Sequence, residues 1–346
     1  MKHHNVAFAA LTLTLSLSAC FNDSSPSHSV LLDDQDPNPM DRSSHYWSPA
    51  RELDATGMTA KDVKPFTPNY PLWSDGLIKK RWIALPAGSQ IDSSDMNAWK
   101  FPRGTKLWKE FSRQDEATGQ LVKVETRLIE KAADGRWLYA SYLWSADQSQ
   151  LLPSQGATDV AALNVPAGTP PVMHDVPNFG QCTLCHMKGS DPVLGFSALQ
   201  LSQDEMAKLV AQGQLSHPPT EPVQIQGSTS LETRVIGYLV ANCSSCHNPR
   251  GSVAMFPLNL SYLVGTPAGQ APVLQAINQF SMAIGPTIPD VHGRYQNIVP
   301  GVPNASMLMH RMKLRNDPDQ MPKYGSKIVD TDGIALISEW ITSLSP

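Results

Sequence analysis

The sequence predicts an α+β fold, in which an N-terminal antiparallel β-rich domain is followed by a mainly α-helical region. Two observations support this prediction. Four short runs rich in β-branched and aromatic residues lie before residue 145 and are separated by Gly, Pro and Asp. After residue 182 the apolar residues recur with helical spacing instead. We therefore expect five consecutive segments, with boundaries after residues 19, 45, 150 and 228.

The first segment, residues 1–19, has the features of an export signal. A basic start at Lys2 precedes an apolar stretch that is too short to span a bilayer, so we expect the segment to be removed. Its ending, Leu-Ser-Ala-Cys, resembles the lipobox of bacterial lipoproteins, which predicts acylation of Cys20 and a lasting lipid anchor. A plain secretory signal with an incidental cysteine is the alternative.

The anchor predicts a place in the cell envelope. Phe21 stands where an Asp would resemble an inner-membrane retention signal, so in a Gram-negative host we expect the outer membrane, on its periplasmic side. Residues 20–45 are rich in Ser, Asp, Asn and Pro and predict a flexible tether. Beyond them no sequence stretch reaches the roughly 18 apolar residues of a membrane span.

The β-rich domain is expected over residues 46–150, which hold seven of the eight tryptophans. Strands are predicted at residues 77–85, 105–111, 121–129 and 137–144. Asp134 and Gly135 lie between the last two and predict a tight hairpin, since glycine accepts the positive φ that such turns need. The domain is therefore expected to be a small antiparallel sheet or a sandwich.

The rest of the chain divides at residue 228. Residues 151–228 are predicted to hold a proline-rich linker, the first of two cysteine motifs and a short amphipathic helix at 202–214. Residues 229–346 are predicted to hold the second motif between two further helices. These helices are expected at 230–243 and from Thr331 or Asp332 to Leu344.

The two cysteine motifs are both C-x-x-C-H. They consist of Cys182, Cys185 and His186 in the first copy, and Cys243, Cys246 and His247 in the second. The spacing suits c-type haem attachment, because two thiols three residues apart can add to the two vinyl groups at one porphyrin edge while the adjacent histidine ligates the iron. A four-cysteine zinc site or a redox dithiol would not need a histidine after each pair.

We therefore expect two covalently bound haem c groups, with His186 and His247 as iron ligands. All five cysteines are then assigned, one to lipid and four to haem, so no structural disulfide is expected. The net charge of −4, without a cluster of Lys and Arg, argues against a nucleic-acid partner.

The sixth iron ligand separates electron transfer from ligand or oxygen chemistry. For the second haem we expect Met321, which precedes Pro322 shortly before the terminal helix. Its rivals are Met307, Met309 and Met312. For the first haem the sequence leaves a vacant position or four candidates, which are Met173, His174, Met206 and His217. Arg311 either pairs with a haem propionate or is a solvated surface side chain.

Residues 229–346 resemble class I cytochrome c, because a helix leads into C-x-x-C-H and a distal Met-Pro precedes a final helix with an aromatic residue. The resemblance implies a cytochrome c-like dihaem region. In it, Val235 and Leu239 of the first helix would pack against Leu336 and Trp340 of the last.

A wider resemblance covers residues 65–346. Its most specific part is Tyr70–Gly76, accompanied by Lys79–Pro86 and Glu125–Leu128. Together with the two motifs, these segments are similar to a family of dihaem c-type cytochromes that are often lipoproteins. Some members of that family accompany parallel β-helix repeat proteins, so the resemblance makes such a protein a candidate partner.

The function expected from these observations is electron transfer between a periplasmic redox donor and acceptor. The alternative is a haem enzyme, either a peroxidase or a small-molecule oxidoreductase, that acts at an open first haem. A third interpretation makes the β-rich domain a recognition module for a partner or polysaccharide, although buried core is the commoner role of tryptophans.

Overall fold

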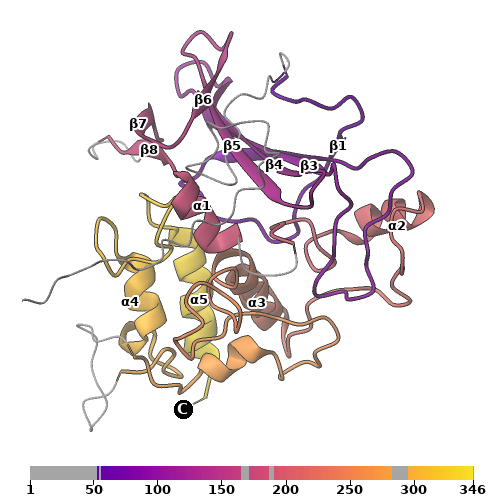
Figure 1. The fold of residues 1–346 in the computed structure, drawn as a ribbon. Coiled ribbons are helices and arrows are strands. Elements are labelled where there is room, and N and C mark those ends of the chain that lie inside the picture. The colour runs from indigo at the N-terminus through magenta and orange to yellow at the C-terminus, as the bar shows by residue number, and fades with distance from the viewer. Residues whose placement is uncertain (1–52, 54–55, 165–170, 187–190, 283–294, 346) are drawn as a thin grey trace, which may run out of the picture. The chain divides into compact units, whose positions relative to one another are not determined.

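The computed structural model describes Leu53 and residues 56–164, 171–186, 191–282 and 295–345 (Figure 1). The predicted signal peptide, Cys20 and the tether lie outside the described residues. The described residues form an α+β fold built from antiparallel sheet and short helices. Across these ranges, no helix has both the length and the apolar character needed to cross a membrane.

The main sheet is a six-stranded antiparallel meander in which each strand pairs with the next along the chain. Its strands are β1 (Lys64–Pro65), β2 (Ile78–Ala84), β3 (Lys106–Gln114), β4 (Leu121–Lys131), β5 (Trp137–Trp144) and β6 (Leu151–Ser154). A separate two-stranded sheet pairs β7 (Ala157–Ala162) with β8 (Met173–Val176). The four predicted strands correspond to β2, β3, β4 and β5.

The sheet extends past residue 150, and of the two predicted forms it takes the single antiparallel sheet. The predicted boundary at residue 150 falls before β6, which pairs with β5 through Ser141 and Ser154 and so belongs to the same sheet. The strands form one meander rather than the two packed sheets of a sandwich. The predicted hairpin is present: Gly135, with φ of 94°, donates its N–H to the Ala132 carbonyl over 3.0 Å.

Five α-helices follow in the described part of the chain. They are α1 (Phe179–His186), α2 (Gln203–Ala211), α3 (Ser230–Asn242), α4 (Met307–Lys313) and α5 (Thr331–Ser343). The helix α2 begins at a capping box, in which Ser202 and Glu205 each bind the other's backbone N–H. Thr229 and Asp330 cap α3 and α5 in the same way with a side-chain oxygen. These caps explain why the three predicted helices begin where they do.

The outer face of the main sheet carries a small core of its own. Because side chains alternate along a strand, Trp82, Trp108 and Leu128 point to the same side. Trp108 and Leu128 are buried there, and Met58 and Val63 of the preceding segment pack against them. This face is therefore closed by the part of the chain that leads into the sheet.

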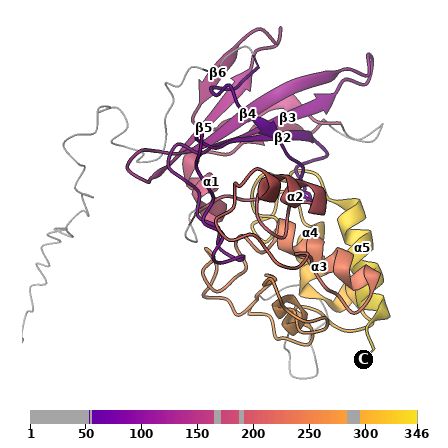
Figure 2. The ribbon, with the colours of Figure 1, turned by 90° about the vertical axis from the view of Figure 1, so that its right-hand side faces the viewer.

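The inner face of the sheet lies on the opposite side. Its apolar side chains include Ile83, Leu107 and Tyr139, which share a buried cluster with Met206 and Leu209 of α2. Figures 1 and 2 both show α1 between the sheet and the group of α3, α4 and α5. The inner face is therefore the side of the sheet that meets the helix bearing the first motif.

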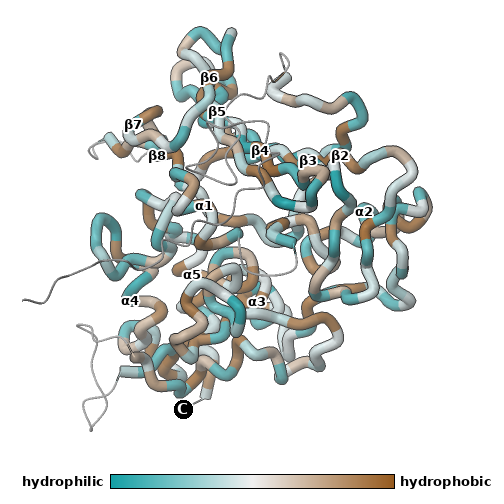
Figure 3. The backbone as a smooth tube through the Cα atoms, in the orientation of Figure 1, coloured by the Kyte–Doolittle hydropathy of each residue, from teal (hydrophilic) through white to brown (hydrophobic). Residues whose placement is uncertain are grey.

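The helices α3, α4 and α5 share a second apolar core. Val235 and Leu239 of α3 are fully buried with Trp340 of α5, and Leu336 packs partly buried against the same cluster. All four residues predicted to pair therefore belong to one core. The apolar residues of α4 and α5 appear as brown stretches in Figure 3. The short 3₁₀ helices η2 (Pro272–Ala276) and η3 (Pro303–Ala305) lie in the intervening loops.

The close approach of α3 to α5 depends on a glycine. A Cβ atom on Gly333 of α5 would collide with the ring of Tyr238 in α3. The Tyr238 hydroxyl then donates to Asp330 Oδ2 over 2.9 Å, while Asp330 Oδ1 accepts the Gly333 N–H over 2.9 Å. One carboxylate thus begins α5 and ties it to α3.

Candidate functional site

The two C-x-x-C-H motifs lie at the ends of two helices that meet. The first occupies the last turn of α1, and the second begins at Cys243, the residue that ends α3. Cys185 Sγ and Cys246 Sγ are 3.6 Å apart, and Cys246 Sγ is also 3.7 Å from the Leu184 carbonyl. The structure therefore places the two motifs in direct contact.

The four cysteines of the motifs are free thiols in the described structure. Burial raises the pKa of Cys243 to about 12 and also raises the pKa of Cys182. The hydrogen bond between the Cys185 and Cys246 thiols lowers the pKa of Cys246 to about 6. None of the four sulfurs is tied up in a disulfide.

His186 is held in one tautomer. Its Nδ1 lies 2.8 Å from the Pro192 carbonyl oxygen, which can only accept, so Nδ1 carries the proton and Nε2 keeps its lone pair. Burial lowers the pKa of His186 to about 4; the Pro192 carbonyl opposes this, and the charges of Lys109 and Arg127 add to it. A neutral imidazole whose second nitrogen is fixed by a backbone carbonyl is the usual arrangement of a metal-ligating histidine.

His247 follows the second motif in a similar position on the chain. Its Nδ1 is buried and, among the described residues, has no hydrogen-bond partner at ordinary geometry. Burial lowers the pKa of His247, the charge of Arg311 lowers it further, and the backbone of Leu258 raises it. The ring is thus expected to be neutral near pH 7, as iron ligation requires.

Met321 lies on the loop between α4 and α5. Its N–H donates to the Arg311 carbonyl over 3.0 Å, and the Arg315 guanidinium binds its carbonyl at 3.4 Å. Its side chain is half buried. Two of the rival methionines, Met309 and Met312, are buried in the core of α3, α4 and α5, and Met307 is buried as well. Burial fits a packing role for these three side chains, and Met321 stays the predicted ligand.

The candidates for the sixth ligand of the first haem are mostly engaged elsewhere. Met206 is buried in the core beneath α2. His174 is buried in β8 with Nε2 3.0 Å from Glu125 Oε1. His217 is exposed beside Ser216, whose hydroxyl lies 2.9 Å from its Nδ1. Met173 is half buried in β8.

The segment Tyr70–Gly76, which carries the family resemblance, is a strap between the sheet and the helices. The Trp73 N–H donates to Asn242 Oδ1 over 2.7 Å, at the end of α3. The Trp73 indole donates to the Ile328 carbonyl over 3.0 Å, and Asp75 Oδ1 accepts the N–H groups of Lys327 and Ile328 at 2.7 Å each. The strap thus holds the loop that follows Met321 against the helix that precedes Cys243.

Sequence reasoning also missed a group of cations on the inner face of the sheet. Arg127 binds Glu125 through two hydrogen bonds, of 2.9 and 2.5 Å, and Glu125 also contacts His174. Lys109 and Arg81 stand in register beside Arg127. The strands that carry these cations hold several other charged residues, so only the register between the strands reveals the group.

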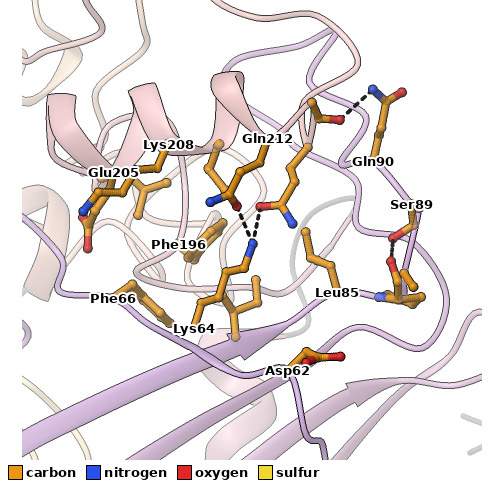
Figure 4. A pocket seen from close by; sticks show the side chains of 18 of the residues that line it. Asp62, Lys64, Phe66, Leu85, Ser89, Gln90, Phe196, Glu205, Lys208 and Gln212 are labelled. Carbon is orange, nitrogen blue, oxygen red and sulfur yellow. Dashed lines mark hydrogen bonds between the residues drawn. The ribbon is translucent and has the colours of Figure 1, made fainter.

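A cavity of about 430 Å³ lies between β1, β2 and α2 (Figure 4). At its wall, the Lys64 ammonium donates to the side chains of Gln212 and Gln214. The rings of Phe66 and Phe196 meet edge to face with centroids 4.9 Å apart. No cysteine or histidine of the motifs lines this cavity, so it is separate from the candidate site.

Neither a cluster of metal-binding side chains nor a similar known protein identifies the site. Among the described residues, no group of three or more His, Cys, Asp or Glu side chains is placed to hold a metal ion. Protein-family models, curated proteins and solved structures were each compared with the chain, and none matches it.

Proposed function

We propose that this protein is a dihaem c-type cytochrome that transfers electrons between redox partners on the periplasmic side of a bacterial envelope. The observation that carries the proposal is the approach of Cys185 to Cys246, 3.6 Å between sulfurs, in two C-x-x-C-H motifs. A thioether at each sulfur would put the attached edges of both haems side by side. Electron tunnelling falls steeply with the distance between cofactor edges, so such an arrangement favours transfer between the haems.

The residues present fit the covalent haems in three respects. The four thiols are free, so each motif offers both thioether positions. His186 is neutral and directs its lone pair through Nε2, because Pro192 binds its other nitrogen. The buried Nδ1 of His247 makes no hydrogen bond of ordinary geometry to the described residues. A bound haem supplies one-electron redox chemistry, and the chain supplies ligation, burial and orientation.

The arrangement of α3 and α5 supports a cytochrome c-like region at residues 229–346. The second motif begins where α3 ends, and Met321 precedes α5. The two helices cross at Gly333, where the ring of Tyr238 takes the place of a side chain. His247 with Met321 would give the second haem His/Met ligation, which raises the reduction potential.

The location and partners follow from the start of the chain. Acylation of Cys20 would anchor the protein to the outer membrane, and the tether would carry the folded part into the periplasm. The partners would then be a periplasmic electron donor and acceptor. A parallel β-helix repeat protein is one candidate among them.

One observation favours a second candidate function, a haem enzyme acting at the first haem. Three of the four candidates for its sixth ligand are engaged elsewhere: Met206 in a core, His174 with Glu125, and His217 at the surface. An iron with an open position could bind a small ligand or peroxide.

An absorption spectrum of the purified protein tests both functions. The protein is made in a host that matures c-type haems, alongside a known cytochrome as a control for maturation. We expect two haems per chain, and one after Cys182→Ala with Cys185→Ala or after Cys243→Ala with Cys246→Ala. Two low-spin haems whose spectra do not change on addition of carbon monoxide would support the electron carrier. A haem that binds carbon monoxide would support the enzyme. A haem-free chain beside a haem-loaded control would contradict the proposal.

A further inference from the structure

A row of cations crosses the inner face of the main sheet. Arg81 of β2 stands opposite Lys109 of β3, and Lys109 stands opposite Arg127 of β4. The three residues are direct neighbours on one face, and Lys79 follows two positions along β2. Like charges placed directly opposite each other destabilise a sheet, so this row needs a compensating negative charge.

Only part of that charge is supplied by the chain. Glu125 neutralises Arg127 through its two hydrogen bonds. The Lys79 ammonium donates to the Leu72 carbonyl over 2.8 Å. In the described part of the chain, the side chains of Arg81 and Lys109 make no ion pair and no hydrogen bond. The Lys109 ammonium lies over the ring of Phe111, whose centroid is 4.6 Å from Nζ.

The surroundings make these two unpaired charges costly. Burial lowers the pKa of Lys109 well below its ordinary value; the charges of Arg81 and Arg127 lower it further, and the charge of Glu125 raises it in part. Burial also lowers the pKa of Arg81 to about 10 and that of Lys79 to about 8. Asp75 and Asp330 raise the pKa of Lys79 only in part. The row is thus a partly desolvated site with two positive charges left over.

The row lies beside the first motif. Tyr139 of β5 stands opposite Ile129, two positions along β4 from Arg127, and its hydroxyl donates to the His186 carbonyl over 3.4 Å. On the same face, the ring of Tyr139 meets that of His186 with centroids 5.7 Å apart. A group attached at Cys182 and Cys185 would therefore lie against this face of the sheet.

We propose that Arg81 and Lys109 bind the two propionate carboxylates of the haem attached at Cys182 and Cys185. A haem carries two propionates, which match the two unpaired cations in number and charge. A guanidinium can hold a carboxylate through two parallel hydrogen bonds, and an ammonium adds a compact charge. The inference rests on the proposed function and names the residues that anchor the first haem at its acidic edge.

Arg127 and Arg311 have other roles in this proposal. Arg127 is already paired with Glu125. Arg311, which the sequence offered as a propionate partner, forms an ion pair of 3.1 Å with Asp319 and acts on His247 of the second motif.

A potentiometric titration of the haem-loaded full chain tests the inference. Lys109→Met removes a cation from the row, and Lys80→Met removes an exposed cation of β2 that points to the outer face. We expect Lys109→Met to lower the reduction potential of one haem, because an unpaired propionate favours the oxidised iron. We expect Lys80→Met and the charge-preserving Lys109→Arg to change it much less. In the variant Cys182→Ala with Cys185→Ala, which keeps only the second haem, adding Lys109→Met should leave the reduction potential of that haem unchanged.

Thermal unfolding of the same proteins supplies a second readout. Removing the Lys109 charge relieves repulsion from the neighbouring cations, which alone would raise the melting temperature. In the haem-loaded protein the substitution also removes the propionate contact, so we expect the melting temperature to fall. Equal potentials and an unchanged or raised melting temperature in Lys109→Met would overturn the inference while the haem content upholds the proposed function. If Lys109→Met does not load haem, Arg81→Met with Arg81→Lys as its control gives the same comparison.

Discussion

The sulfur atoms of Cys185 and Cys246 are 3.6 Å apart, although the residues are 61 positions apart in the chain. Their contact arises because α1 ends beside the residue at which α3 ends. The hydrogen bond between the two thiols ties the inner face of the sheet, which packs on α1, to the core of α3, α4 and α5.

The first prediction concerns the chain made without haem maturation. A mild dithiol oxidant such as diamide should oxidise Cys185 and Cys246 to a disulfide, because only a small movement brings sulfurs 3.6 Å apart to bonding distance. Peptide mapping by mass spectrometry would identify the link, and Cys246→Ser is the control. The haem-loaded protein should give no such link, since its sulfurs are thioethers. A link only between Cys182 and Cys243 would contradict the geometry.

Met321 provides the second prediction. In the haem-loaded protein, Met321→Ala should abolish the weak methionine-to-iron absorption band and lower the reduction potential of one haem, because His/Met ligation raises it. Met309→Ala is the matched control, since Met309 is buried in the core of α4. That variant should lose stability, by about 2–5 kcal/mol, and keep the band. A band that survives Met321→Ala would exclude Met321 as the ligand.

The third prediction tests the core between α3 and α5. Trp340 is 2% exposed and packs with Val235 and Leu239. Trp340→Ala should lower the free energy of unfolding by about 3–5 kcal/mol, because it leaves a large cavity. Leu152→Ala on β6, whose side chain is 49% exposed, should change it by less than about 0.5 kcal/mol. Urea unfolding followed by circular dichroism measures both, and similar losses would argue against this core.

The fourth prediction reverses an ordinary rule. In an exposed helix, Gly→Ala stabilises by about 1 kcal/mol. At Gly237 in α3 a Cβ atom would collide with the ring of Tyr70, so Gly237→Ala should destabilise the protein. In a Tyr70→Ala background the same substitution should become neutral or stabilising. A double-mutant cycle in urea measures the coupling, and additive effects would show that the strap does not cover α3.

The fifth prediction concerns acid. Burial alone would raise the pKa of Glu125, but Arg127 and His174 outweigh it and lower that pKa from 4.5 to about 2. The stability that Glu125 contributes is thus fully present above about pH 4.5 and is lost as pH falls towards about 2. Glu125→Gln should cost about 3–5 kcal/mol near neutral pH, since it leaves a buried Arg127 unpaired. The difference in free energy of unfolding between Glu125→Gln and the parent protein should become smaller below pH 4.5. A difference that stays constant with pH would contradict the role given to the Glu125 carboxylate.

The strongest sequence patterns predicted the type and the bounds of individual strands and helices. The run of β-branched and aromatic residues at Trp137–Trp144 forms β5 with the predicted bounds. Thr229 and Asp330 are capping residues followed by helical periodicity, and α3 and α5 begin directly after them. The approach of α1 to α3 could not be read in the same way, because it depends on which distant surfaces pack together. The role of Trp73 was hidden for that reason, since its partners lie at Asn242 and Ile328.

The cation row shows a second limit of pattern reading. A Lys or an Arg within a strand ordinarily indicates a solvated position, and Arg81 and Lys109 were not distinguished from surface charges on that basis. Only the register of three strands puts them side by side on the inner face. The methionines of α4 show the converse, because Met307 and Met312 have the chemistry of iron ligands but the burial of core residues.

The strap Tyr70–Gly76 limits how this chain can be divided. Trp73 and Asp75 supply hydrogen bonds to the end of α3 and to the loop before α5, and Tyr70 covers Gly237. A fragment that begins at residue 229 would lack all three contacts, and the backbone N–H groups of Lys327 and Ile328 would lose their acceptor. We therefore expect residues 229–346 not to fold as an independent domain in another protein, because part of their packing is supplied by the segment Tyr70–Gly76.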